Sequence, residues 1–120
     1  MNSEKKILGL GDRLSGIKSR DKGYQIDLSE RELREQVRDM CGLFGWKFHF
    51  TWLAIHSPKG FPDLVLRKPP RIIYAEIKTE KGKLTPAQEE WQVDLKACGQ
   101  ETYVWRPSQF TEIISILRGL

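Results

Sequence analysis

Cysteine and histidine are scarce in this 120-residue chain, which has two of each. Cys41 and Cys98 form no CxxC pair, and His49 and His56 do not stand at a ligand spacing to them. Because a structural zinc ion is held by four such ligands at short spacings, the sequence argues against a zinc site. Each cysteine falls inside a helical pattern, and we expect both to be buried free thiols rather than a disulfide.

Long hydrophobic runs are also absent. No apolar stretch is long enough to span a bilayer, and the first residues show no signal-peptide pattern, so we expect a cytoplasmic protein. A content of 39% hydrophobic and 30% charged residues is that of a soluble protein with room for one domain. The net charge of +4 favours a polyanionic partner without identifying one.

The first 28 residues differ from the rest of the chain. They carry six Lys/Arg against four Asp/Glu, and glycines at four positions interrupt any helical pattern. We expect residues 1–28 to form a basic, flexible arm, which is either simply disordered or ordered on DNA or on a second subunit. The folded domain is then expected to span residues 29–120.

Three segments carry helix signals. Ser29 and Glu32 match a capping box, and Gly45 is a typical helix stop. Thr85 followed by Pro86 indicates the start of a second helix. A third helix is expected to begin at residues 107–108. Its apolar residues exceed what one sheet contact needs, so they either form a dimer interface or are buried within their own subunit: Ile113, Ile114, Ile116 and Leu117.

Strand-like runs occur at residues 46–52, 64–66, 72–77 and 102–105. The second and third flank a Pro-Pro turn and predict an antiparallel hairpin. A helix separates the third run from the fourth, so the last strand should join the sheet parallel to a neighbour. The expected fold is α/β, a small mixed sheet flanked by helices in the order α-β-β-β-α-β-α.

The predicted hairpin brings charged residues together at one end. Asp63 stands at the start of the first strand, and Glu76 and Lys78 stand at the end of the second, on one face. Two carboxylates are suited to Mg²⁺ or Mn²⁺, which can polarise a phosphodiester, and a lysine can offset the developing charge. The alternative is a hairpin end that carries three surface charges and one ion pair.

At these residues the sequence resembles the PD-(D/E)XK nucleases, whose signature matches Pro62-Asp63 followed by Glu76-Ile77-Lys78. A wider pattern resembles the VRR-NUC branch, which includes small stand-alone phage and bacterial nucleases. It covers about residues 29–118, and its motifs are Gly60-Phe61-Pro62-Asp63-Leu64, Ala75-Glu76-Ile77-Lys78, Gly82-Lys83-Leu84, Gln88-x-x-Trp91, Gly99 and Tyr103-x-Trp105-x-Pro107. The resemblance implies a restriction-endonuclease-like core.

The resemblance also implies roles for individual residues. Asp63 and Glu76, with the Ile77 carbonyl, are expected to bind the metal ion, and Lys78 to position the attacking water. Gln88 is either an active-site residue or a satisfied core amide, and Trp91 is assigned to the core. Glu30 is either a further acidic group of the site or an ordinary favourable charge in the first turn of its helix. The expected DNA contacts come from two loops: Ser57, Lys59 and Gly60 in one, and Lys81 and Lys83 in the other.

The implied function is a Mg²⁺-dependent deoxyribonuclease that leaves a 5′-phosphate and a 3′-hydroxyl. Because the chain has no separate recognition domain, we favour a structure-selective endonuclease similar to Holliday-junction resolvases, acting on branched DNA as a homodimer. The alternatives are a restriction-like or exonucleolytic enzyme on linear or flap DNA, and a DNA-binding module without turnover.

Overall fold

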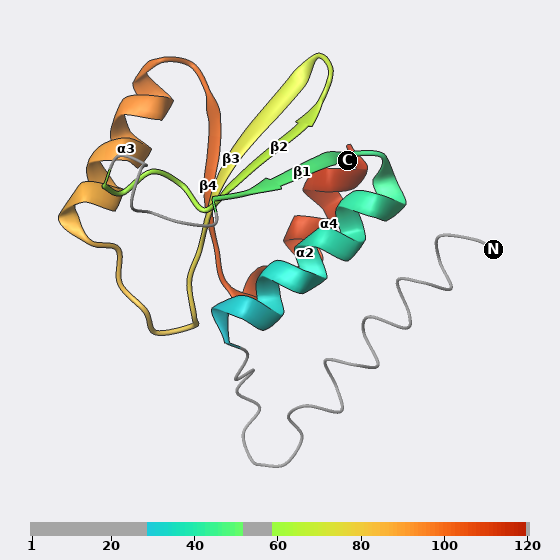
Figure 1. The fold of residues 1–120 in the computed structure, drawn as a ribbon, viewed down its shortest axis with the longest axis horizontal. Coiled ribbons are helices and arrows are strands. Elements are labelled where there is room, and N and C mark those ends of the chain that lie inside the picture. Colours follow the sequence, from blue (N-terminus) through green and yellow to red (C-terminus); the bar gives the residue numbers. More distant parts are fainter. Residues whose placement is uncertain (1–28, 52–58, 120) are drawn as a thin grey trace, which may run out of the picture.

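The structure is a computed structural model that describes residues 29–51 and 59–119 (Figure 1). The predicted arm at 1–28 lies outside the described residues, as do His56 and Ser57. The described segments follow the predicted order α-β-β-β-α-β-α. Their bounds are α2 (Glu30–Phe44), β1 (Lys47–Phe50), β2 (Leu64–Lys68), β3 (Arg71–Ile77), α3 (Pro86–Ala97), β4 (Glu101–Trp105) and α4 (Phe110–Arg118).

The strands form one mixed sheet in the order β1-β2-β3-β4. The first three strands are antiparallel neighbours, and β4 pairs with β3 in parallel after the α3 crossover. The predicted hairpin is therefore confirmed, with Leu64 paired to Ala75 and Lys68 to Arg71. This register is consistent with the alternation of the sequence, because Ile73, Ala75 and Ile77 all face the buried side.

Local capping explains where the helices begin. The Ser29 hydroxyl accepts from the Glu32 main-chain N–H, and the Glu32 carboxylate accepts from the Ser29 N–H, which is the predicted capping box. Thr85 caps α3 in the same way, and Pro86 occupies the first turn. At the other end of α2, Gly45 adopts the left-handed conformation (φ 85°) that a helix stop often requires.

Helices cover both faces of the sheet. In Figure 1, α2 and α4 lie together on one side and α3 on the other. The main core lies between the sheet and the α2/α4 pair, where these side chains are buried: Leu33, Val37, Met40, Cys41, Trp46, Leu64, Leu66, Ile73, Ala75, Ile77, Trp105, Ile113 and Leu117.

The apolar side of α4 packs within its own subunit. Ile113 and Leu117 are buried, and Ile114 and Ile116 are half-buried against the same core. Of the two explanations that the sequence left open for this surface, the packing favours burial within the subunit over a dimer interface.

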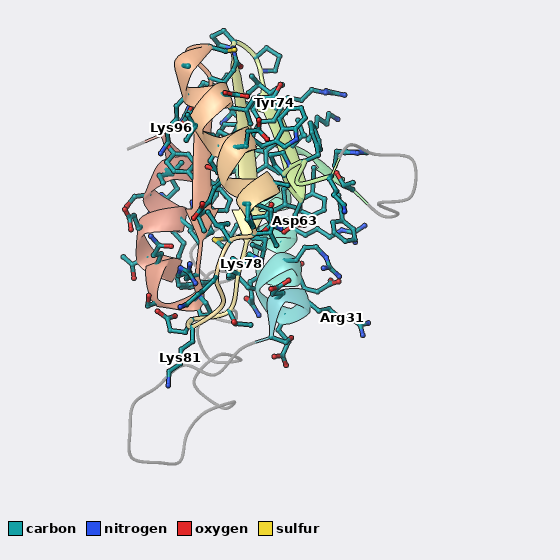
Figure 2. All side chains as sticks on the ribbon, turned by 90° about the vertical axis from the view of Figure 1, so that its left-hand side faces the viewer. Arg31, Asp63, Tyr74, Lys78, Lys81 and Lys96 are labelled. Atoms are coloured by element: carbon teal, nitrogen blue, oxygen red, sulfur yellow. The ribbon has the colours of Figure 1, made fainter. Side chains whose placement is uncertain are left out.

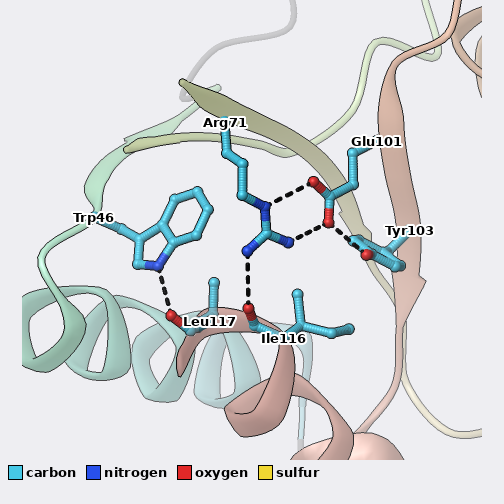
Figure 3. Close-up of polar contacts among 6 residues, drawn as sticks. All are labelled: Trp46, Arg71, Glu101, Tyr103, Ile116 and Leu117. Carbon is cyan, nitrogen blue, oxygen red and sulfur yellow. Dashed lines mark hydrogen bonds and ion pairs between the residues drawn. The ribbon is translucent and has the colours of Figure 1, made fainter. Parts of the chain in front are cut away.

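A polar cluster fixes the C-terminal end of α4 to the starts of β3 and β4 (Figure 3). Arg71 donates from Nε and Nη2 to the two carboxylate oxygens of Glu101, and from Nη1 to the Ile116 carbonyl at 3.3 Å. Trp46 Nε1 donates to the Leu117 carbonyl at 2.8 Å. The Arg71 guanidinium, by its hydrogen bond, holds the pKa of Glu101 below its ordinary value. This cluster lies at the opposite end of β3 from Glu76.

Several local predictions were wrong. Cys41 is buried, and burial raises the pKa of its thiol to about 12, but Cys98 is exposed because it follows α3 rather than lying inside it. The strand expected over 46–52 ends at Phe50, and residues 52–58 lie outside the described ranges. The last helix begins at Phe110, after a 3₁₀ turn at Pro107–Gln109.

Within the described residues, no helix is long and apolar enough to cross a bilayer.

Candidate active site

The carboxyl groups of Asp63 and Glu76 meet at one end of the β2–β3 hairpin. Continuing the register in which Leu64 pairs with Ala75, Asp63 faces Glu76 across the two strands. Asp63 Oδ2 accepts from the Ile77 main-chain N–H at 2.9 Å, and the Asp63 carbonyl accepts from the Thr51 N–H at 2.8 Å. Main-chain N–H groups of Ile77 and Thr51 therefore hold both the carboxylate and the carbonyl of Asp63 in place.

Glu76 is buried, although the sequence places it at a strand end with charged neighbours. Its exposed fraction is 2%, its Oε2 accepts from Gln88 Nε2 at 2.9 Å, and its Oε1 has no hydrogen-bond partner among the described residues. Burial, and next the negative charge of Asp63, raise the pKa of Glu76 to about 8. Lys78 opposes this rise, and Glu30 adds to it. A buried carboxyl beside a second carboxyl, with one oxygen unpaired, is poorly satisfied by the protein alone.

The orientation of Gln88 follows from its place in the α3 cap. Its Oε1 accepts from the Thr85 main-chain N–H at 2.9 Å, so the amide nitrogen is the end that remains for Glu76. Gln88 therefore contacts one member of the carboxylate pair. It also satisfies one oxygen of Glu76, which leaves Oε1 as the oxygen available to a ligand.

The donor set fits a hard divalent cation. Among the described residues, no group of three or more His, Cys, Asp or Glu side chains is arranged to hold a metal ion. Mg²⁺ is often bound through only one or two carboxylates while it keeps several waters, so the Asp63–Glu76 pair is sufficient in number. The unpaired Oε1 and the raised pKa of Glu76 indicate a place where a positive charge would be stabilised. Glu30 influences Glu76 through its charge, but its side chain is exposed.

Lys78 directly follows β3, and its main-chain N–H donates to the Trp105 carbonyl at 3.0 Å. This bond continues the parallel β3–β4 ladder by one residue and places Lys78 beside the carboxylates. Figure 2 shows Asp63 and Lys78 near the same end of the sheet, with Arg31 on the flank of α2 and Lys81 farther out. Lys78 is half-buried, and its charge acts on Glu76 electrostatically.

Gly60 has a packing role that the sequence did not reveal. Its φ is 82°, and a Cβ built there would lie 2.4 Å from the carbonyl carbon of Ala87. The segment before β2 can therefore approach the first turn of α3 only with glycine at this position. Trp91 reinforces the contact, because its Nε1 donates to the Lys59 carbonyl and its ring meets Phe61 edge-on at 5.1 Å. Trp91 is half-buried and lies outside the main core to which it was assigned.

The loop at 79–84, which carries the exposed Lys81 and Lys83, is held by Arg106. Arg106 Nη1 donates to the carbonyls of Thr79 and Gly82, both at 2.7 Å. Sequence reasoning missed this residue, since nothing in the local pattern of Arg106 relates it to a loop more than twenty positions earlier. Of the other expected DNA contacts, Lys59 is exposed, and Ser57 lies outside the described residues.

Comparison with known proteins agrees with this geometry. A family model described as the VRR-NUC domain matches residues 26–109, a range that includes both carboxylates, Lys78, Gln88 and Arg106. No curated protein and no solved structure gave a match.

Proposed function

Because this chain belongs to the VRR-NUC domain family, we propose that it is a divalent-metal-dependent nuclease that hydrolyses DNA phosphodiester bonds at the Asp63–Glu76 pair. Family membership implies a nuclease; the metal, the substrate and the residue roles are the proposal. The observation that carries it is the buried Glu76 beside a second carboxylate, because its Oε1 has no partner in the part of the chain that the structure describes.

Each residue has a defined part in this proposal. Asp63 and Glu76, with the Ile77 carbonyl, would hold Mg²⁺ or Mn²⁺. When bound, such an ion polarises the phosphodiester and lowers the pKa of a coordinated water. Lys78 orients that water and offsets charge that develops on the phosphate. Gln88 keeps Glu76 oriented through the hydrogen bond to Oε2.

The outer residues act less directly. Glu30 contributes negative charge near the site, which is supported by its effect on the pKa of Glu76. Lys59, Lys81 and Lys83 are exposed and contact DNA phosphates. Gly60 is better explained by its approach to α3 than by a contact with DNA.

The proposed substrate is branched DNA, with a four-way junction cut by a homodimer as the preferred case. A single site cannot readily reach two strands related by the symmetry of a junction, whereas a two-fold dimer places two identical sites in a fixed relation. Since the apolar side of α4 is packed within the subunit, such a dimer would need another interface. Linear or flap DNA remains the alternative substrate.

Cleavage assays with full-length protein test the site. Asp63→Asn and Glu76→Gln each remove an anionic ligand while keeping the shape, so cleavage in Mg²⁺ should fall by orders of magnitude. Glu90→Gln, an exposed carboxylate on α3, is the matched control and should cleave like the wild type. Near-normal turnover by either site variant would refute the assignment. DNA binding with no cleavage in any divalent metal would favour the non-catalytic module.

Two further measurements refine the proposal. Mg²⁺ should raise the melting temperature of the wild type but not that of Glu76→Gln, which is a test of the metal site independent of activity. A panel of four-way, flap, nicked and linear DNA tests the substrate. Equal cutting of junction and linear duplex by a monomer would contradict the junction proposal and leave the nuclease assignment standing.

A further inference from the structure

A groove of about 300 Å³ lies between α2 and β1, outside the carboxylate pair. Because β1 is an edge strand of the sheet, this flank has no further strand beside it among the described residues. The groove is cationic by formal charge, with two arginines against one glutamate. The residues that line it are Arg34, Glu35, Arg38, Phe48, His49 and Phe50.

The two arginines lie over aromatic rings. The Arg34 guanidinium carbon lies 4.0 Å from the centroid of the Phe50 ring, and that of Arg38 lies 5.6 Å from Phe48. A guanidinium on an aromatic face is held in position while the N–H groups at its rim remain able to donate to an anion. These rings come from alternate residues of β1, so both lie on the face of the strand that meets α2.

The donors of these guanidinium groups are not used elsewhere in the described parts of the chain, where Arg34 and Arg38 make no hydrogen bond or ion pair in addition to their ring contacts. Two other arginines contrast with them. Arg71 is occupied by Glu101, and Arg106 by the carbonyls of the loop at 79–84. The α2 arginines are therefore preorganised for a ligand that the described residues do not supply.

The groove begins next to the proposed active site. Phe50 pairs with Leu64, which directly follows Asp63, and the Thr51 N–H donates to the Asp63 carbonyl. On the α2 side, Arg34 stands one turn after Glu30, whose charge reaches Glu76. From there the groove follows α2 and β1 away from the carboxylates. These contacts place the Phe50 end of the groove close to the carboxylate pair.

We propose that this groove holds the sugar–phosphate backbone of the DNA strand that flanks the cleaved phosphate, with Arg34 and Arg38 donating to successive phosphates. The inference rests on the proposed function, because it takes the Asp63–Glu76 pair as the point of cleavage. The two arginines are one helical turn apart, about 6 Å along the axis, which is close to the spacing of neighbouring phosphates on a strand. Stacked guanidinium groups also suit phosphate better than lysines would, since their fork-like donors match its oxygens.

Glu35 limits how strongly the groove attracts DNA. A groove with one excess positive charge cannot gather a polyanion by its field alone, so its contribution depends on the placement of the arginine donors. Phosphate contacts of this kind set the register and orientation of DNA on a protein. The effect of the groove is therefore to fix which phosphate of the DNA lies at the Asp63–Glu76 pair. The edge of β1 is a poor template for a protein strand, because the charged Lys47 and the polar His49 are exposed along it.

Binding experiments with the full-length protein in EDTA, where no strand is cut, test the groove. The double variant Arg34→Gln/Arg38→Gln should bind a labelled four-way junction at least tenfold more weakly at low salt. The slope of log affinity against log salt should become shallower by about 1.8, which is about 0.9 for each of two lost phosphate contacts. Arg118→Gln is the matched control. Arg118, on α4, also lies over an aromatic ring, but this ring belongs to Phe44 at the C-terminal end of α2. The Arg118→Gln variant should keep the wild-type salt slope.

A scan with methylphosphonates, which remove the charge of single phosphates, locates the contacts on the DNA. Wild-type protein should be sensitive at two neighbouring phosphates that flank the cleavage site, and the double variant should have lost sensitivity at those two alone. An unchanged salt slope together with an unchanged methylphosphonate profile would overturn the groove while leaving metal-dependent cleavage intact. A shallower salt slope for the double variant of a protein that never cleaves DNA would keep the groove as a phosphate-binding site. It would remove both the nuclease proposal and the placement of the groove beside a cleaved phosphate. A wild type that binds no DNA would overturn both.

Discussion

Replacing Glu76 by glutamine should stabilise the metal-free protein at alkaline pH, although it removes a residue of the proposed site. The pKa of Glu76 is raised from an ordinary 4.5 to about 8 in the folded protein, first by burial and second by Asp63. Between these two values the folded state keeps a proton that the unfolded state releases, so folding stability falls as pH rises. At 1.36 kcal/mol per pKa unit, the loss between pH 4.5 and pH 8 is at most about 5 kcal/mol.

Glutamine resembles the protonated carboxyl. Its side-chain oxygen can still accept from Gln88 Nε2, and it carries no charge to be repelled by Asp63. Urea unfolding of full-length protein in EDTA should therefore show a stability that falls from pH 5 to pH 8 for the wild type and changes much less for Glu76→Gln. The variant should be the more stable protein at pH 8, by a few kcal/mol. Adding Mg²⁺ should reverse this order, since the cation stabilises only a protein that keeps the carboxylate.

The control for this measurement is Glu90→Gln, which removes an exposed carboxylate from α3 and should follow the wild-type profile. Parallel pH profiles for the wild type and Glu76→Gln in EDTA would refute the reasoning. Such a result would mean that Glu76 is ionised without cost in the metal-free protein. The argument that its unpaired oxygen indicates a cation site would then fail as well.

Three other predictions concern groups outside the carboxylate pair. Gly60→Ala should destabilise the domain by more than the roughly 1–2 kcal/mol that a left-handed alanine costs, because the alanine Cβ would also lie 2.4 Å from the α3 backbone. Thermal unfolding measures this loss, and an unchanged melting temperature would contradict the prediction. Arg71→Met should cost only about 1 kcal/mol, since its pair with Glu101 is partly exposed, and Glu101→Gln should cost less; urea midpoints compare the two. Arg106→Met should free the loop at 79–84 with little change in global stability, because Arg106 binds the carbonyls of that loop. Trypsin should then cleave faster at the lysines of the loop. Equal cleavage rates for variant and wild type would show that the carbonyl contacts do not order the loop.

Local signals in the sequence accounted for most of the elements. Capping residues stand within three positions of the groups they satisfy, so the starts of α2 and α3 could be predicted directly. The Pro-Pro turn is equally local, and the hairpin that it forms necessarily opposes residues at equal distances from the turn. That symmetry is why the sequence alone could pair Asp63 with Glu76. The parallel pairing of the last strand followed from the length of the helical connection before it.

Other features depended on contacts between segments far apart in the chain. The sequence shows Glu76 as a charged residue near a strand end. Only the tertiary structure buries it, bonds it to Gln88 of α3 and leaves its Oε1 without a partner among the described residues. The approach of Gly60 to Ala87, the hold of Arg106 on the loop at 79–84, and the rings beneath Arg34 and Arg38 likewise join elements whose separation no periodicity encodes. Hydrophobic period and capping specify how each element forms and which face it buries. The environment of a particular carboxylate or guanidinium is set by how those faces pack together, and that packing exists only once the chain has folded.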